Sequence, residues 1–524
     1  MTGARRGSVA LARGARLLVA GVVAAATVAC ATGGPPRAVV AAPLPSGPLS
    51  MTPSGAQADP LAPYYAQRLG WRACGDGFTC AWLEVPLDYS APARAIELAV
   101  VRLATHGKGR IGSLVLNPGG PGGSGVDYAR GVGKGLPESV RSHFDIVGFD
   151  PRGVGQSRPA IRCVTSQQLD DFVAQEPVPH DAAQKQALLD ESHTFANGCA
   201  ARSADLLAHV GTVDVARDLD VLRAALGDEK LTYLGKSYGT LLGALYAEQF
   251  PARVRALVLD GAVDPSLSGE QLNEQQAVGF ETAFHDFLQY CLANSCPLGN
   301  DIDSASRGLS ELFDQVAAHP LPTPKAAHGP LLESHAVLAV LAALYSRSPG
   351  WALLRAALAR AKAGDGSALM DLADGLNQRR NDGSYTNLLE SNIAINCVDR
   401  PYPTDMASYD ASVDVLARIA PHFGAAVAYS GLSCAFWPVK PVDKPRRLQV
   451  TGTAPILVIG TKNDPATPYQ WAQSLASQLA GSALLTFTGD GHTVYGDGRS
   501  TCIDDLTDSY LVDLRVPPAD QICN

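Results

Sequence analysis

The sequence lacks the motifs of several large classes of protein. It has no cysteine and histidine spacing of a zinc finger and no stripe of basic residues, and its net charge is −9 over 524 residues. Nucleic acid is therefore not an expected partner. The glycine-rich stretch at residues 117–125 is not followed by Gly-Lys-Ser/Thr, which argues against a phosphate-binding loop. No spacing indicates a metal, so we expect neither a metal nor a cofactor.

The first 30 residues have the layout of an export signal. Four arginines precede an apolar run over residues 17–29, which is too short to span a bilayer comfortably. The run ends at Cys30 in a segment that resembles a bacterial lipobox, where the cysteine is lipidated after cleavage. Simple cleavage is the alternative, and both predict a secreted or cell-envelope protein that meets the membrane only through a lipid. Residues 31–66 are rich in Pro, Ala, Gly and Ser and predict a flexible tether.

The remaining ten cysteines are even in number, which in an exported chain favours disulfides. The sequence alone does not determine their pairing. The simplest hypothesis joins neighbours along the chain: Cys74 with Cys80, Cys163 with Cys199, Cys291 with Cys296, Cys397 with Cys434, and Cys502 with Cys523.

The clearest indication of chemistry is a G-x-S-x-G turn around Ser237. A strand-prone run over residues 231–234 leads into it, and an apolar helical segment follows until Pro251. Glycines are needed on both sides of the serine, because a Cβ there would collide with the neighbouring backbone. Such a turn exposes the serine Oγ at the top of a sheet. We therefore predict Ser237 as a nucleophile; an ordinary loop between a strand and a helix is the alternative.

The glycine-rich stretch at residues 117–125 directly follows the apolar strand expected over residues 112–116. Glycines there let backbone N–H groups face a ligand without intervening side chains. In an acyl-transfer enzyme this is the place for an oxyanion donor, the other being the N–H of the residue after the nucleophile. We predict an oxyanion hole formed by Gly120 and Tyr238, with Gly119 as the next choice.

An acid and a base follow late in the chain. Asp464 lies on the turn after the strand expected over residues 455–460, and His492 lies in a glycine-flanked loop after a last strand over 483–487. Together with Ser237 they have the Ser, Asp, His order of α/β-hydrolases. Asp260 also ends a strand downstream of the serine and is the alternative acid.

Three segments together, residues 118–122, 150–157 and 235–240, resemble the α/β-hydrolase serine peptidases. The chain is similar to the tripeptidyl aminopeptidases and proline iminopeptidases of actinobacteria from about residue 70 to the C-terminus. The resemblance implies an α/β fold, with a mostly parallel central sheet and helices on both faces, and it favours Asp464 as the acid. Within the second segment, Asp150 and Arg152 predict an internal ion pair that braces the turn; contact with the substrate is the alternative.

Residues 268–446 show no strand pattern, and their apolar residues have helical spacing. This predicts a helical insertion between two parts of the hydrolase core, residues 67–267 and 447–524. In the family this insertion is a cap over the active site, and such a cap restricts entry to a chain end. An exopeptidase needs carboxylates to hold the substrate ammonium. Glu390 and Asp399 flank a stretch that looks like the family's and are the candidates to bind the ammonium group; a solvated surface charge is the alternative for either.

These features predict an exported serine exopeptidase that releases di- or tripeptides from peptides with a free N-terminus. A carboxylesterase or lipase is the alternative, because the same triad hydrolyses esters and the cap decides the substrate. A binding protein on an inactive hydrolase scaffold is a third possibility, against which the complete triad argues.

Overall fold

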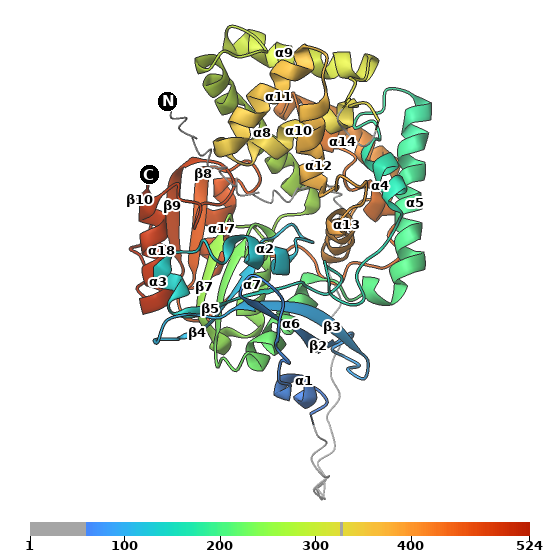
Figure 1. Ribbon diagram of the computed structural model, residues 1–524. Coiled ribbons are helices and arrows are strands. Elements are labelled where there is room, and N and C mark those ends of the chain that lie inside the picture. The colour runs from blue at the N-terminus through green and yellow to red at the C-terminus, as the bar shows by residue number, and fades with distance from the viewer. Residues whose placement is uncertain (1–58, 325–328) are drawn as a thin grey trace, which may run out of the picture.

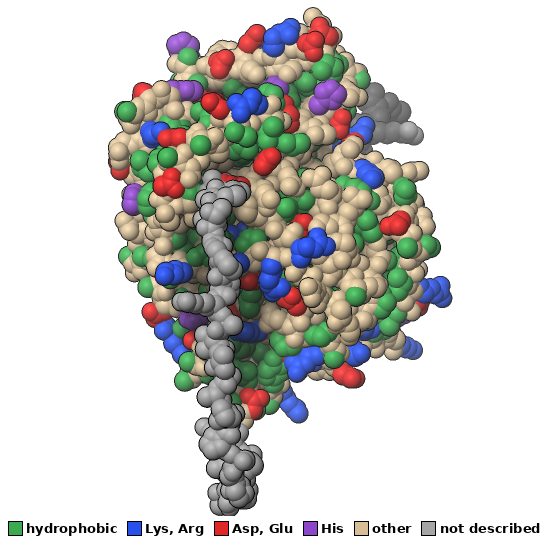
Figure 2. Space-filling model, turned by 180° about the vertical axis from the view of Figure 1, so that it is seen from behind, with side chains coloured by type: hydrophobic (Ala, Val, Ile, Leu, Met, Phe, Trp, Pro, Cys, Tyr) green, Lys and Arg blue, Asp and Glu red, His purple; other side chains and the backbone are tan. Residues whose placement is uncertain are grey.

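The structure is a computed structural model that describes residues 59–324 and 329–524. The predicted signal segment, Cys30 and most of the predicted tether lie outside these residues. The described chain forms a sheet-based core below a second, helical part (Figure 1). No helix within the described ranges has the length and apolar character needed to cross a membrane. On the face seen in Figure 2, acidic and basic side chains are interspersed.

The core is built on one ten-stranded sheet with the order β1-β2-β3-β5-β4-β6-β7-β8-β9-β10. The pairs from β1 to β5 along that order are antiparallel, and those from β5 to β10 are parallel. This confirms the predicted mostly parallel sheet. The strands are β1 (Arg72–Ala73), β2 (Phe78–Pro86), β3 (Ala95–Leu103), β4 (Gly112–Asn117), β5 (Phe144–Phe149), β6 (Leu231–Lys236), β7 (Val254–Asp260), β8 (Leu457–Asn463), β9 (Ala483–Asp490) and β10 (Gln521–Cys523).

Helices cover both faces of the sheet, so the central strands are buried on both sides and are almost continuously apolar. One face packs against α2 (Gly125–Val132), α3 (Glu138–Arg141) and α18 (Thr501–Asp513). The other packs against α6 (Thr212–Ala225), α7 (Tyr238–Gln249) and α17 (Tyr469–Gln478). The short α1 (Ala62–Ala66) and η1 (Pro251–Arg253) complete the core.

The helical part has its own hydrophobic core. Within the described residues between β7 and β8 the structure has helices but no strand, as the helical spacing predicts. They are α8 (Gly269–Ala293), α9 (Ile302–Ala318), α10 (Glu333–Leu344), η2 (Arg347–Trp351), α11 (Ala352–Lys362), α12 (Ser367–Asn377), α13 (Leu388–Asp399), α14 (Met406–Ile419), α15 (Gly424–Val427) and α16 (Leu432–Ala435). This helical part is called the cap below.

Two helices that precede the cap in sequence lie beside it in space (Figure 1). They are α4 (Ser166–Val173) and α5 (Ala182–Leu207). On α5, Lys185 pairs with Asp410 of α14 at 2.7 Å, and the His193 ring stacks on Phe436 with centroids 3.6 Å apart. The first core part, predicted as residues 67–267, therefore contributes a segment that packs with the cap.

The ten cysteines outside the N-terminal segment pair with their neighbours in the chain, in the order that the simplest hypothesis gives. The pair Cys397–Cys434 joins α13 to α16 within the cap, and Cys502–Cys523 joins α18 to the edge strand β10.

Candidate active site

Ser237 lies between the end of β6 and the start of α7 in a strained backbone conformation. Its φ and ψ angles are 56° and −127°, outside the regions that a serine ordinarily adopts. The flanking glycines are sterically required. A Cβ on Gly235 would lie 2.3 Å from the Gly239 carbonyl oxygen, and one on Gly239 would lie 2.8 Å from Asn117 Oδ1. The local sequence therefore produces the sharp elbow that its glycines predict.

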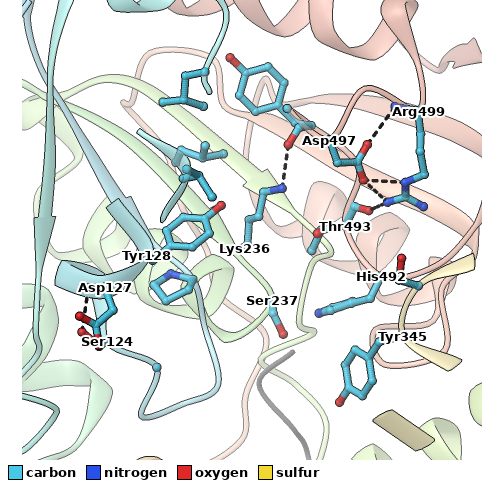
Figure 3. Close-up of a pocket in the computed structure, with 18 of the residues that line it drawn as sticks. Ser124, Asp127, Tyr128, Lys236, Ser237, Tyr345, His492, Thr493, Asp497 and Arg499 are labelled. Carbon is cyan, nitrogen blue, oxygen red and sulfur yellow. Dashed lines mark hydrogen bonds and ion pairs between the residues drawn. The ribbon is translucent and has the colours of Figure 1, made fainter. Parts of the chain in front are cut away.

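The predicted acid and base are in contact. His492 Nδ1 lies 2.9 Å from Asp464 Oδ1 and 3.0 Å from Oδ2. The carboxylate is fixed, because the N–H groups of Ala466 and Thr467 donate to Oδ1 and the Thr467 hydroxyl donates to Oδ2, each at 2.9 Å. The buried His492 Nε2 has no hydrogen-bond partner among the described residues. Ser237 lines the same cavity (Figure 3), and no other group occupies this nitrogen, which a general base for the serine must keep free.

The alternative acid, Asp260, has a different position and other partners. Its carboxylate accepts from the N–H groups of Val494 and Tyr495, each at 3.0 Å, and lies 3.5 Å from Lys236 Nζ. Burial raises the pKa of Asp260, while the neighbouring lysine lowers it. Asp260 thus holds the loop that follows His492 against the strand that carries the nucleophile, and the acid at the imidazole is Asp464.

The two predicted oxyanion donors lie beside the nucleophile. Gly120, Tyr238 and Ser237 line a small cavity of about 50 Å³. Tyr238 is the first residue of α7, so its N–H has no helical carbonyl to bond. Gly119, the second choice, donates its N–H to Asn117 Oδ1 at 2.9 Å and is occupied. The contacts therefore favour Gly120.

The ion pair expected between Asp150 and Arg152 is not formed, and that prediction was wrong. Arg152 is buried and donates Nε to Asp218 Oδ2 at 2.7 Å and Nη2 to Asp218 Oδ1 at 2.6 Å. Asp150 accepts from the Ser124 hydroxyl at 2.6 Å and from the N–H of Gln156 at 2.8 Å. Burial raises the pKa of Asp150 to about 6. The two charged groups brace the same turn from opposite sides, each with its own partners.

Glu390 does not reach the cavity of the nucleophile, so the prediction that it binds the substrate ammonium is corrected. It is 1% exposed, and its Oε1 accepts from the backbone N–H groups of Cys163 at 2.6 Å and Val164 at 3.2 Å. Its Oε2 lies 3.5 Å from Arg162. The side chain therefore fixes α13 of the cap to the segment before α4.

Asp399 is also committed to the protein and is not placed to receive an ammonium group. It accepts from the Thr212 N–H at 2.7 Å and from the Thr212 hydroxyl at 2.5 Å. That hydroxyl also bonds the Tyr238 hydroxyl at 2.5 Å. Burial raises the pKa of Asp399 to about 6. The result is a buried chain of polar groups from the end of α13 to the residue after the nucleophile.

A larger cavity, of about 210 Å³, is also lined by Ser237 and is called the main cavity below. Core and cap both line it. The cap contributes Tyr345, whose ring meets the His492 ring edge-on at 5.5 Å and whose carbonyl accepts from the His492 N–H at 2.8 Å. Sequence reasoning missed Tyr345, because nothing near it in the sequence indicates a contact with a loop almost 150 residues away.

Across residues 59–324 and 329–524, no group of three or more His, Cys, Asp or Glu side chains could hold a metal ion. The arrangement that these residues do present is that of nucleophilic acyl transfer. It combines a serine on a strained elbow, an imidazole oriented by a fixed carboxylate, and backbone donors beside the serine.

Comparison with known proteins gives two family models and several full-length relatives. Residues 112–307 match the model described as the alpha/beta hydrolase fold, and residues 420–523 match the model of TAP-like proteins. Serine protease Hip1 of Mycobacterium tuberculosis is 41% identical over 492 residues, which cover 90% of this chain and 93% of the relative. Carboxylesterase B of the same species is 36% identical, covering 90% and 92%. A tripeptidyl aminopeptidase of Streptomyces lividans is 36% identical, covering 85% and 83%.

Proposed function

The chain belongs to the α/β-hydrolase family that includes the tripeptidyl aminopeptidases and is a serine hydrolase, and we propose that it releases di- or tripeptides from the free N-terminus of peptides. The observation that carries the proposal is the placement of the Ser237 elbow and His492 in one cavity that core and cap residues line together. A cap over the nucleophile favours chain ends over loops within a folded protein.

In the proposed reaction, His492 Nε2 removes the proton from Ser237 as the serine oxygen attacks the peptide carbonyl. Asp464 holds the imidazole with Nδ1 protonated and stabilises the imidazolium that forms. The N–H groups of Tyr238 and Gly120 hold the oxyanion. The imidazolium then gives its proton to the leaving amine, and water, activated by the same histidine, releases the acyl group from the serine.

We further propose that the protein is exported. The arginines and the apolar run before Cys30 support this, as do the five disulfides, which are typical of chains that fold in an oxidising compartment. Lipidation of Cys30 is tested by the mass of the mature protein, since retained acyl chains add mass that simple cleavage does not.

An esterase is the second candidate, because one relative over 90% of the chain carries the name Carboxylesterase B. Both candidates use the same triad and differ in what the main cavity selects. The deciding experiment compares free and N-acetylated tripeptidyl anilides with short and long acyl esters. Purified wild type and Ser237→Ala are assayed side by side. Cleavage restricted to the free-amine peptides, and lost in the variant, supports the aminopeptidase. Preference for esters, with indifference to acetylation, refutes it.

A further inference from the structure

Selection of a free N-terminus requires a carboxylate at the active site that is not already used by the protein. An ammonium group is held best by a charge-assisted hydrogen bond, and a fixed contact of this kind sets the distance from the chain end to the scissile bond. The two carboxylates expected from the sequence, Glu390 and Asp399, are occupied by backbone and hydroxyl donors. The anchor must therefore lie elsewhere around Ser237.

Two cavities adjoin Ser237, and their carboxylates can be compared directly. The small cavity beside Tyr238 is lined by one charged residue, Arg400, which would repel an ammonium group. The main cavity is lined by two carboxylates, Asp127 and Asp497. Asp497 forms an ion pair with Arg499 at 2.5 Å and accepts the Arg499 N–H at 3.0 Å. Its charge is already balanced.

Asp127 differs from these acids. It lies in the first turn of α2 and is exposed. Its backbone N–H bonds the Ser124 hydroxyl, but its carboxylate has no ion pair or hydrogen bond within the part of the chain that the structure describes. In Figure 3, Asp127 lies across the cavity from His492, with Ser237 between them in that view.

The same cavity holds further polar atoms that have no partner. The buried Tyr345 hydroxyl and His492 Nε2 form no hydrogen bond among the described residues. Burial raises the pKa of Tyr345, so its hydroxyl stays protonated and can donate. A buried polar group without a partner costs free energy unless a ligand or water satisfies it. His492 Nε2 is reserved for Ser237, whereas the Tyr345 hydroxyl is suited to an amide group of a short peptide, as Asp127 is suited to its ammonium end.

We propose that Asp127 binds the N-terminal ammonium group of the substrate. This inference rests on the proposed aminopeptidase function and identifies the residue through which the enzyme distinguishes a free from a blocked N-terminus. The lysine and arginine side chains of the cavity, Lys236 and Arg499, do not compete for Asp127. Lys236 Nζ donates to the Tyr495 carbonyl at 2.7 Å, and Arg499 holds Asp497 and two carbonyls of the His492 loop.

The test measures kcat/KM of wild type and Asp127→Asn on a free tripeptidyl anilide and on its N-acetylated counterpart. We expect the variant to lose about 10- to 100-fold on the free substrate, mostly in KM, because a hydrogen bond to a charged group is removed. Hydrolysis of the acetylated substrate and labelling of Ser237 by a fluorophosphonate should not change. Glu138→Gln is the matched control. Glu138 is an exposed acid of the neighbouring α3 that pairs with His106 outside the cavity, and the control should behave as wild type.

A pH series gives a second measurement. In wild type, KM for the free substrate should rise above about pH 8, where an α-amino group loses its proton, and this rise should be weaker in Asp127→Asn. If wild type prefers the free amine and Asp127→Asn keeps the full preference, the assignment of Asp127 is overturned while the aminopeptidase function stands. If wild type itself shows no preference for the free amine, the proposed function fails and the assignment fails with it.

Discussion

Replacing Asp464 by asparagine separates the proposed triad acid from its alternative, Asp260. The contacts around Asp464 determine how an asparagine would be oriented. Two backbone N–H groups, from Ala466 and Thr467, point at Oδ1, so the amide oxygen would take that position. The NH₂ group would then occupy the position of Oδ2, which lies 3.0 Å from His492 Nδ1.

In that orientation the amide donates a hydrogen bond to Nδ1 instead of accepting one. His492 would then carry its proton on Nε2, the nitrogen that must accept the proton of Ser237. In a well-studied Ser-His-Asp triad the same exchange lowers kcat by about 10⁴-fold. This corresponds to about 5 kcal/mol of transition-state stabilisation. We expect a loss of that order here, with little change in KM.

Asp260→Asn is the matched comparison, because it makes the same change at a buried carboxylate that does not contact the imidazole. It leaves the charge of Lys236 without its partner, so it should lower the free energy of unfolding by about 3 kcal/mol or more. Its kcat per folded molecule, counted by fluorophosphonate titration, should fall less than tenfold. The reasoning is refuted if Asp464→Asn keeps more than a tenth of the wild-type kcat, or if folded Asp260→Asn shows the larger loss.

Three further predictions concern the cap and its connections. Thr212→Val removes the hydroxyl that lies between Asp399 and Tyr238, so kcat should fall on the order of tenfold with KM little changed. Thr212→Ser keeps a hydroxyl at this position and should have a kcat close to that of wild type. Cys434→Ser opens a loop with a sequence separation of 37 and should lower the free energy of unfolding by about 4 kcal/mol. Cys296→Ser opens a loop with a separation of 5 and should lower the free energy of unfolding by about 2 kcal/mol. Denaturant titration measures both values. For Asp399, burial raises the pKa from 3.8 to about 6, so its ionisation opposes folding. This penalty is absent below pH 3.8 and complete above about pH 6. The free energy of unfolding of wild type, measured in urea, should therefore fall by about 2 kcal/mol relative to that of Asp399→Asn between pH 4 and pH 7, and an equal pH dependence of the two proteins would contradict this.

The parts of the site that could be predicted from the sequence depend on local geometry. The turn at Ser237 excludes any Cβ at its flanking glycines, and the order of strands places an acid and a histidine at the same edge of the sheet. These two inferences need only the residues of the turn and the known direction of a parallel sheet. The cysteine pairing is different, because three of the five pairs are 21 to 37 residues apart and the sequence supports them only as the simplest hypothesis.

The roles of the cap residues could not be predicted in this way. Glu390 and Cys163 are more than 200 residues apart, and only the folded cap brings the carboxylate onto the backbone N–H groups of the segment before α4. The same holds for α5, which precedes the cap in sequence but packs beside α14 and α16. An acidic side chain in a sequence does not reveal whether distant donors already satisfy its oxygen atoms.

The acids near Ser237 therefore divide by what their oxygen atoms already bind. Asp464 uses both oxygens to orient the imidazole, Asp260 holds the loop that follows His492, and Asp399 holds the first residue of α6. Because each of these carboxylates is satisfied within the protein, an incoming ammonium group would have to displace an existing donor to reach it, at a cost in free energy. Asp127 requires no such displacement, since its carboxylate is exposed in the main cavity. This difference explains why Asp464, Asp260 and Asp399 hold protein groups in place around Ser237. The substrate ammonium group is instead bound by Asp127 on α2, which belongs to no catalytic motif.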